Sequence, residues 1–258
     1  MNEGQGRAKK SLGQHFLVDR SAIARIANAI PEGTATLEIG PGRGAITEAL
    51  LQRVGALTLI ELDDALAAMW LERSESEPKL HLVHGDVMKE LGPTVADKAP
   101  QWIAGNLPYN ISGPLSAALF SLHLSGGMVL MYQREVADRI AADAGSKTYG
   151  GLSVLARHFY NVKRLLLLPP GAFNPPPKVH SAVLLLTPHG QQPACDFDAL
   201  QRTVRQGFAH RRKTINNNFR GDMDAADWAT VGIDPGTRPE QLDYPAWSRL
   251  ATFLASRS

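Results

Sequence analysis

Hydrophobic residues recur along the chain with two different periods, and these periods alternate as far as about residue 187. Short apolar runs, typical of buried strands, lie at 35–40, 56–63, 79–86, 101–106, 126–133, 163–169 and 180–188. Runs with helical spacing lie at 21–30, 44–55, 64–74, 114–122, 134–142 and 152–160. Because alternating strands and helices pack as a parallel sheet covered on both faces, we predict an α/β, Rossmann-like domain with a mostly parallel sheet.

The pattern changes towards the end of the chain. A loop rather than a helix joins the last two strand runs, so we expect an antiparallel edge on the seven-stranded sheet. The segment 187–196 is polar and rich in Pro and Gly, which is typical of a linker. Beyond it the spacing is only helical, at 197–209, 212–219, 225–231 and 245–255. The sequence therefore predicts two domains, residues 1–187 and a small α-helical domain of residues 188–258.

The composition is that of a globular protein without membrane spans. Of the 258 residues, 44% are hydrophobic and 20% are charged, and no apolar stretch reaches the length of a membrane helix. The first 16 residues are polar and basic and lack the apolar centre of a secretory signal, so we expect a cytoplasmic protein. Cys195 is the only cysteine, which excludes an internal disulfide and a multi-cysteine metal site. We expect a plain thiol, no metal and a monomeric protein.

Charge is distributed unevenly although the net charge is only +2. Residues 144–221 contain eleven Lys and Arg against two Asp and Glu, whereas the segments on either side are net acidic. A solvated helix face would normally mix acids with its bases. This basic third of the chain, with the basic N-terminal segment, therefore indicates a polyanionic partner such as a nucleic acid.

Three predicted strands end in residues suited to a nucleotide. Gly40 and Gly42 follow the first strand, Glu61 ends the second and Asp86 follows the third. In an open parallel sheet ligands bind at these strand ends, where glycines admit a ligand close to the backbone and Glu61 can accept bonds from ribose hydroxyls. Asp86 can accept from the amine of a base or can simply cap its helix. The glycine pattern also fits a dinucleotide site loosely, so NAD and S-adenosylmethionine both stay open here.

The fourth strand ends in the segment GNLPYNIS, which favours chemistry on an adenine. The amine of adenine is a poor nucleophile, and two hydrogen-bond acceptors can draw it towards tetrahedral geometry. The side-chain oxygen of Asn106 and the carbonyl of Leu107, fixed by Pro108, can be those acceptors. Tyr109 can stack on a base removed from its helix. A plain turn would explain Asn106 and Pro108 but gives no reason for Tyr109.

A second aromatic residue precedes a stiff proline triplet in FNPPPKVHSAV. Phe173 can cover the other face of the base, although a loop phenylalanine more often packs into the nearest core. Lys178 in the same segment can meet a phosphate or be solvated. We therefore expect Phe173 in the base site and Lys178 among the RNA contacts.

Seven segments together resemble the KsgA-type small-subunit rRNA adenine dimethyltransferases. They are KKSLGQHFLVD, EIGPGRGAIT, IELD, GDVMK, GNLPYNIS, FNPPPKVHSAV and GFAHRRKTI, and the similarity runs from about Lys9 to the end of the chain. The resemblance implies a class I methyltransferase fold with S-adenosyl-L-methionine as cofactor. It also implies dimethylation of N6 on two adjacent adenosines near the 3′ end of 16S rRNA, on the small ribosomal subunit, with a role in ribosome assembly.

The resemblance also assigns residues. It implies cofactor contacts at His15, Leu17, Gly40, Gly42, Glu61, Leu62, Asp86, Val87 and Asn106. It implies rRNA contacts at Arg211, Arg212 and Lys213. Many relatives have asparagine in place of His15, which leaves its side-chain role open, while the backbone of Leu17 is the safer contact.

Other functions remain open on sequence alone. The nearest are the large-subunit rRNA adenine methyltransferases that confer macrolide resistance, and the DNA adenine methyltransferases. A methyltransferase-like factor that binds RNA without turnover is a further alternative, against which the complete set of site residues argues. An NAD dehydrogenase would leave the basic third of the chain unexplained.

Overall fold

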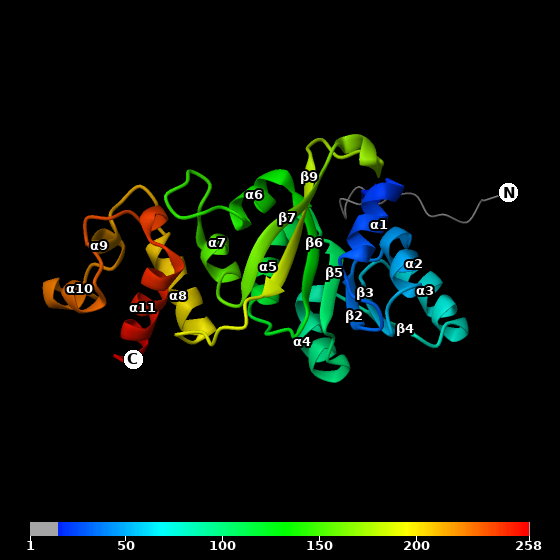
Figure 1. Ribbon diagram of the computed structural model, residues 1–258, viewed down its shortest axis with the longest axis horizontal. Helices are drawn as coiled ribbons and strands as arrows, with labels where there is room; N and C mark the ends of the chain where they lie inside the picture. Colours follow the sequence, from blue (N-terminus) through cyan, green and yellow to red (C-terminus); the bar gives the residue numbers. More distant parts are fainter. Residues whose placement is uncertain (1–14, 258) are drawn as a thin grey trace. The chain divides into compact units, whose positions relative to one another are not determined.

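Seven strands of the computed structural model form one sheet, in the order β4-β3-β2-β5-β6-β9-β7 (Figure 1). The strands are β2 (Ala35–Ile39), β3 (Ala56–Glu61), β4 (Leu80–His84), β5 (Trp102–Asn106), β6 (Gly127–Gln133), β7 (Tyr160–Leu168) and β9 (Ser181–Pro188). Strands β2 to β6 all run parallel to one another, and β9 is antiparallel to β6. The predicted Rossmann-like class, with its antiparallel edge, is confirmed. The structure describes residues 15–257, so the basic N-terminal segment 1–14 lies outside the described residues.

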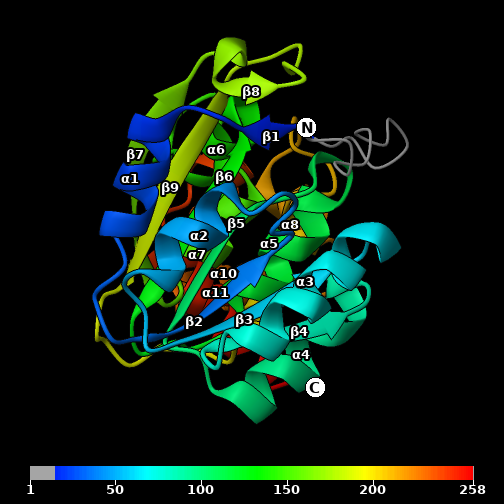
Figure 2. The ribbon, with the colours of Figure 1, turned by 90° about the vertical axis from the view of Figure 1, so that its right-hand side faces the viewer.

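The parallel strands are apolar because both faces of the sheet are covered. Leu37, Leu57 and Ile103 lie in the centre of three adjacent strands and have no exposed surface. Strands that are buried on both faces show continuous apolar runs rather than alternation, which explains why the sequence pattern located them. Figure 2 shows helix α2 in front of these strands.

Six helices accompany the parallel strands. They are α1 (Arg20–Asn28), α2 (Ala45–Leu51), α3 (Asp64–Ser76), α4 (Val87–Lys98), α5 (Ser112–Phe120) and α6 (Arg134–Ile140). Helix α1 precedes β2, and each of the other five follows one of the strands β2 to β6. Aspartates begin three of them: the side chains of Asp19, Asp63 and Asp86 accept hydrogen bonds from first-turn N–H groups of α1, α3 and α4. These caps fix where the loops at the strand ends turn into helices.

The sequence prediction gave no extent for one helix and missed one further feature of the fold. Helix α4 contains Gly92 and Pro93, which are breaking signals, yet Val87, Leu91 and Thr94 are buried and packing outweighs propensity there. The other feature is a two-strand ribbon of β1 (Phe16–Leu17) and β8 (Phe173–Asn174), visible at the top of Figure 2. Strands of two residues are too short to show any period.

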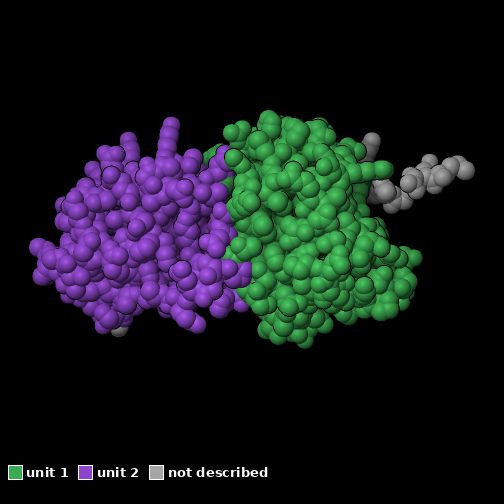
Figure 3. Space-filling view, in the orientation of Figure 1, with its two compact units in different colours: residues 1–115, 124–137, 163–187 green, residues 116–123, 138–162, 188–258 purple. Residues whose placement is uncertain are grey.

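The chain divides into two compact units (Figure 3). The first contains the described residues up to Leu115, with Leu124–Ala137 and Lys163–Thr187. The second contains Ser116–His123, Asp138–Val162 and the chain from Pro188 onwards. The last boundary between the units lies after Thr187, where the sequence predicted the domain boundary. However, the second unit also contains two segments that precede this residue. The separation into domains of residues 1–187 and 188–258 stays a prediction.

Five helices build most of the second unit around large aromatic side chains. The helices are α7 (Gly151–Ala156), α8 (Phe197–Gly207), α9 (Ile215–Asn218), α10 (Ala225–Val231) and α11 (Tyr244–Ala255). Trp247 of α11 is completely buried and stacks on Phe208 at 5.2 Å between ring centroids. A Cβ at Gly207 of α8 would come within 2.3 Å of the Trp247 ring, so this position requires glycine. No helix in the described part of the chain is long and apolar enough to cross a membrane.

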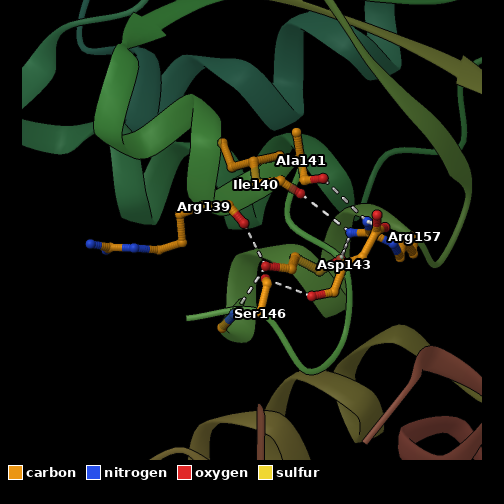
Figure 4. Close-up of polar contacts among 8 residues, drawn as sticks. Arg139, Ile140, Ala141, Asp143, Ser146 and Arg157 are labelled. Atoms are coloured by element: carbon orange, nitrogen blue, oxygen red, sulfur yellow. Dashed lines mark hydrogen bonds and ion pairs between the residues drawn. The ribbon is translucent and has the colours of Figure 1, made fainter. Parts of the chain in front are cut away.

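Arg157 fixes the loop that follows α6 (Figure 4). Its guanidinium donates to the carbonyl oxygens of Ile140 and Ala141, at 3.3 and 3.4 Å, and to the carboxylate of Asp143 at 2.9 Å. It also donates to the carbonyl of Ser153 at 2.8 Å. Three of these four acceptors are backbone carbonyls, which belong to the end of α6, to the loop after it and to α7 (Gly151–Ala156), so Arg157 links the two helices to the loop between them.

Replacing Arg157 by alanine is expected to lower the free energy of unfolding by about 1–3 kcal/mol, because several carbonyls lose a charged donor together. Asp143→Ala is the matched control. The Asp143 side chain is 93% exposed, so its ion pair with Arg157 should contribute no more than about 0.5 kcal/mol. Urea unfolding of the two variants measures both values, and an equal loss would show that the ion pair rather than the backbone contacts stabilises the loop.

Candidate cofactor and base site

A cavity of about 560 Å³ lies at the carboxyl ends of β2, β3, β4 and β5. Such a volume is typical of small-molecule and cofactor sites. It brings together all the predicted cofactor residues and most of the predicted base site: His15, Leu17, Gly40, Gly42, Glu61, Leu62, Asp86, Val87, Asn106, Leu107, Pro108 and Tyr109. All these residues belong to the first unit.

The glycine loop between β2 and α2 is fitted closely between two aromatic side chains. Gly42 has φ of 56°, and a Cβ there would lie 2.9 Å from the ring of Phe16. Gly44 has φ of 85°, and a Cβ there would lie 2.5 Å from Trp70. The indole N–H of Trp70 in turn donates to the Gly42 carbonyl at 3.0 Å. The loop can therefore bring its backbone to a ligand only because these positions carry no side chain.

Glu61 ends β3, and its carboxylate accepts hydrogen bonds from backbone N–H groups of the glycine loop and of the residue that caps α3. Its Oε2 accepts from the N–H of Gly42 at 3.2 Å and its Oε1 from the N–H of Asp63 at 2.8 Å. Burial raises the pKa of Glu61, and these backbone hydrogen bonds oppose the rise. The carboxylate is thus oriented before any ligand arrives, with oxygen lone pairs left for further donors such as ribose hydroxyls.

Asp86 caps α4 and also lines the cavity, so its predicted contact with a base remains a prediction. One carboxylate oxygen, Oδ1, accepts a hydrogen bond from the N–H of Met88 at 2.9 Å, and Asp86 is thereby the N-cap of α4. The residue also lines the cavity, where it can accept from the amine of a base. Leu62 and Val87, the residues after Glu61 and Asp86, provide apolar surface beside them, and Leu62 is 52% exposed.

Asn106 presents a hydrogen-bond acceptor that has no partner. Its Nδ2 donates to the main-chain carbonyl of His15 at 3.0 Å, which fixes the orientation of the amide. Its Oδ1 is buried and has no hydrogen-bond partner among the described residues 15–257, and the residue lines the cavity. A buried acceptor without a donor is costly, and a ligand N–H would remove that cost. Next to it, the N–H of Leu107 donates to the Met131 carbonyl at 3.1 Å, which anchors the following peptide.

Tyr109 begins a short 3₁₀ turn (Tyr109–Ile111) at the edge of the cavity. Its hydroxyl is 2.9 Å from the Ser181 hydroxyl, which holds the ring from the β9 side. The His15 imidazole lies nearly parallel to the ring, at 6.0 Å between centroids and an angle of 26°. His15 itself is held by a 2.8 Å hydrogen bond from Nδ1 to the Pro175 carbonyl. The Tyr109 ring is therefore fixed in position and available as a stacking surface.

The structure does not bring Phe173 into the cavity. Its side chain is 3% exposed and belongs to the hydrophobic core, and its backbone pairs with Leu17 across the β1–β8 ribbon. The neighbouring Asn174 lines the cavity instead. In this structure Phe173 supports the cavity wall through the core, which is the ordinary behaviour of a loop phenylalanine next to a sheet.

The predicted RNA contacts lie on the surfaces of both units. Arg211, Arg212 and Lys213 are exposed in the turn after α8, and the guanidinium of Arg211 donates to the carbonyl of Lys147. Lys178 is exposed in the first unit, in the segment before β9. The three residues of the second unit thus form one basic cluster. Lys178 does not belong to this cluster, because it lies in the first unit.

Among the residues of the cavity wall that sequence reasoning missed, three carry a charge or an aromatic ring. Phe16 and Arg43 both line it, with the Arg43 guanidinium 4.5 Å from the centroid of the Phe16 ring. The third is Glu38 of β2, a carboxylic acid with only 1% exposure. A signal for Glu38 was present, because it is the single charged residue within the otherwise uncharged strand ATLEI.

Comparison with known sequences identifies close relatives over almost the whole chain. The profile of the family described as ribosomal RNA adenine dimethylase matches residues 5–256. Two proteins named ribosomal RNA small subunit methyltransferase A are each 45% identical to this chain. They come from Xanthomonas campestris pv. campestris strain B100, over 249 residues, and Xanthomonas oryzae pv. oryzae strain PXO99A, over 251 residues, and each match covers 95% of both chains.

Solved structures of similar fold agree with this comparison. A dimethyladenosine transferase from Plasmodium falciparum is 26% identical, with a TM-score of 0.76, over 92% of this chain and 96% of its own. The 23S rRNA methyltransferase ErmE, at 22% identity and a TM-score of 0.68, shares the fold over 93% of this chain and 99% of its own.

Proposed function

The chain belongs to the ribosomal RNA adenine dimethylase family, and from that membership we propose that it dimethylates N6 of two adjacent adenosines near the 3′ end of 16S rRNA. The enzyme uses S-adenosyl-L-methionine, whose sulfonium supplies the methyl group. The residues of the cavity fit this cofactor: the volume is adequate, the glycine loop exposes backbone, and Glu61 and Asp86 offer acceptors at adjacent strand ends. The small ribosomal subunit is the proposed substrate particle, and a role in its assembly follows from acting on it.

The observation that carries the proposal is the unpaired Oδ1 of Asn106. The amide is oriented by its bond to the His15 carbonyl, so the free oxygen can accept one hydrogen of the target amine. The Leu107 carbonyl, set by Pro108, can accept the other. Two acceptors pull the nitrogen towards tetrahedral geometry and direct its lone pair at the methyl donor, so positioning supplies most of the catalysis.

Tyr109 is proposed to provide the surface on which the target adenine stacks. An adenine can reach the cavity only after it leaves its base stack, which costs a few kcal/mol, of the order known for flipped bases. Stacking on the ring of Tyr109 offsets this cost, and the Ser181 hydroxyl keeps the ring in place. The proton of the methylated nitrogen leaves to water, because the positively charged product amine is acidic and needs no dedicated base.

The basic cluster of Arg211, Arg212 and Lys213 is the proposed contact with rRNA phosphates. Arg211→Ala combined with Arg212→Ala is expected to weaken binding to small subunits and to flatten its salt dependence, by about 0.7 to 0.9 in the log–log slope for each phosphate that is no longer neutralised. Filter binding at several salt concentrations measures both quantities.

A control for this prediction removes the same charge elsewhere. Lys79→Ala with Lys98→Ala alters two exposed lysines outside the basic third of the chain and should leave the slope unchanged. If the double arginine variant keeps the slope of the unaltered protein, the cluster does not contact phosphate. Contacts of this kind give affinity rather than sequence readout, so the shape of the ribosomal site would supply specificity.

The test of the function is methyl transfer from labelled S-adenosylmethionine to small subunits that lack the modification. Digested RNA is analysed by mass for N6,N6-dimethyladenosine near the 3′ end of 16S rRNA, with Asn106→Ala as the inactive control. Label in large-subunit RNA instead would indicate the resistance-type activity. Tight binding to subunits without any transfer would indicate an assembly factor on a methyltransferase scaffold. We further propose that the enzyme works in the cytoplasm, since its substrate is the small subunit. We also propose that it is a monomer.

A further inference from the structure

Glu38 is a buried carboxylic acid in the wall of the cofactor cavity to which the proposed chemistry gives no role. It lies near the end of β2, two residues before Gly40, and is paired with Leu59 of β3 and Ala104 of β5. Its side chain is 1% exposed, and Oε2 has no hydrogen-bond partner. An unpaired buried carboxyl oxygen at a ligand cavity is costly unless a ligand or a proton satisfies it.

The surroundings of Glu38 favour its neutral form. The charged groups that face it are Glu61 from β3 and Glu48 from α2, and both are acids. Thr47 of α2 is the polar neighbour, and the paired residue on β5 is Ala104. Burial, with a smaller effect of the two acids, raises the pKa of Glu38 to about 8, against the opposing effect of the Thr47 hydroxyl. These surroundings therefore favour the protonated form of Glu38 at neutral pH.

The position of Glu38 in the sheet matches the charged end of the cofactor. Asp86 follows β4 and Glu61 ends β3, and these two residues suit the adenine and the ribose. Asn106 ends β5, where the target amine must meet the methyl group. The strand order β4-β3-β2-β5 therefore leaves β2, the strand of Glu38, between the ribose and the reacting centre. The sulfonium and the amino-acid end of the cofactor, which carry its positive charges, belong to that interval.

We propose that Glu38 is the counter-charge of the cofactor: it releases its proton to solvent when the cationic S-adenosylmethionine binds, and takes a proton back when the cavity empties. This proposal rests on the assigned cofactor. No bond other than the O–H bond of Glu38 breaks, and buffer accepts the proton. Glu38 is thus a positioning residue whose charge appears only when a positive ligand is present to pair with it.

The proposal fixes the direction of the pH dependence. Binding must ionise Glu38 at any pH below the pKa of the empty protein, so affinity falls as the pH drops below about 8. The change approaches tenfold in the dissociation constant per pH unit, because one proton is coupled to binding. Above that pH the carboxylate is already charged and this contribution levels off.

Isothermal titration calorimetry of the unaltered protein and Glu38→Gln tests the proposal. S-adenosylmethionine is titrated at pH 7 in two buffers with different ionisation enthalpies, which gives the number of protons released. The unaltered protein should release close to one proton more than Glu38→Gln, and only the unaltered protein should show the steep pH dependence. The amino group of the cofactor also titrates, but its contribution is the same for both proteins and cancels in the difference.

Glu75→Gln is the matched control, because it removes an acid of the same kind from an exposed position on α3, and Glu75 is not among the groups that shift the pKa of Glu38. It should release as many protons as the unaltered protein. Equal release by Glu38→Gln and the unaltered protein would overturn the proposal while leaving the cofactor assignment intact. Failure of every protein to bind S-adenosylmethionine would overturn the cofactor assignment and the proposal together.

Two further measurements do not depend on catalysis. Infrared difference spectra of the unaltered protein should show the band of a protonated carboxyl disappearing when the cofactor binds, and an unchanged band would contradict the proposal even if Glu38→Gln failed to fold. In the absence of cofactor, the folding equilibrium constant of the unaltered protein should fall relative to Glu38→Gln as the pH rises from 4.5 towards about 8, by up to about tenfold per unit. The reason is that the folded protein holds a proton in this interval that the unfolded chain has lost.

Discussion

Replacing Asn106 by alanine is expected to lower the rate of methyl transfer by about two to three orders of magnitude, because it removes an oriented acceptor from the reacting nitrogen. The side chain also donates to the carbonyl of His15, so the variant loses one link between β5 and the segment before β1. Single-turnover transfer to unmodified small subunits measures the rate. Binding of S-adenosylmethionine and thermal unfolding, measured in parallel, separate a loss of chemistry from a loss of structure.

Asn106→Asp is the informative companion to this variant. An aspartate keeps an oxygen at the position of Oδ1 but loses the Nδ2 donor, and it adds a negative charge beside the cationic cofactor. We propose that the neutral amide lets one pocket accept both the amine and the monomethylamine, because it tolerates the loss of one hydrogen bond. The ratio of second to first transfer rates in Asn106→Asp should therefore change. An equal loss in both steps would contradict this hypothesis, and a rate unchanged in Asn106→Ala would contradict the acceptor role altogether.

Tyr109→Ala is expected to cause the next largest loss, roughly 10- to 100-fold in kcat/KM, because a base stacked on an aromatic ring gains about 1–3 kcal/mol. Tyr109 is positioned for this role by its turn and by the Ser181 hydroxyl at 2.9 Å. The effect should appear for RNA and not for the cofactor, whose affinity is measured separately by calorimetry.

Tyr109→Phe and Ser181→Ala test the ring apart from its hydroxyl. Phenylalanine keeps the stacking surface and loses only the hydrogen bond to Ser181, so its activity should remain within a few-fold of the unaltered enzyme. Burial raises the pKa of the Tyr109 hydroxyl, so the residue stays neutral at the working pH and its ionisation does not contribute. A loss in Tyr109→Phe as large as in Tyr109→Ala would show that the hydroxyl acts in the reaction and that stacking does not explain the effect.

The sequence predicted the central strands of the sheet well because these strands are buried on both faces. Runs such as those of β6 and β9 are continuous and mostly apolar, and every strand of the seven-stranded sheet was expected. The length of the helix that Asp86 caps, α4, was not predicted, because Gly92 and Pro93 oppose a helix locally while burial of Leu91 and Thr94 stabilises it through long-range packing. Long-range packing of this kind leaves no periodic signal in the sequence.

The candidate site shows the same limit. Residues at strand ends, such as Glu61 and Asn106, were located because topology brings the carboxyl ends of parallel strands to one edge. Phe173 was expected beside the base, yet its loop turns the side chain into the core. The hydrogen bond that orients Asn106 is accepted by the carbonyl of His15, 91 residues earlier in the chain, and no local pattern could reveal it. The roles of these residues in binding and catalysis stay predictions.

The β1–β8 ribbon sets the order in which the cavity can be completed during synthesis. Phe16 and Leu17 are among the first described residues to leave the ribosome, but their strand partners are Asn174 and Phe173. Until that segment has emerged, Phe16 lacks the partner strand that holds its ring against Gly42, and His15 lacks the carbonyl of Pro175. The nascent chain therefore acquires a closed cofactor cavity only after about two thirds of its length has been translated. The wall of the cofactor site in this enzyme of ribosomal subunits is therefore incomplete until the ribosome has synthesised most of the chain.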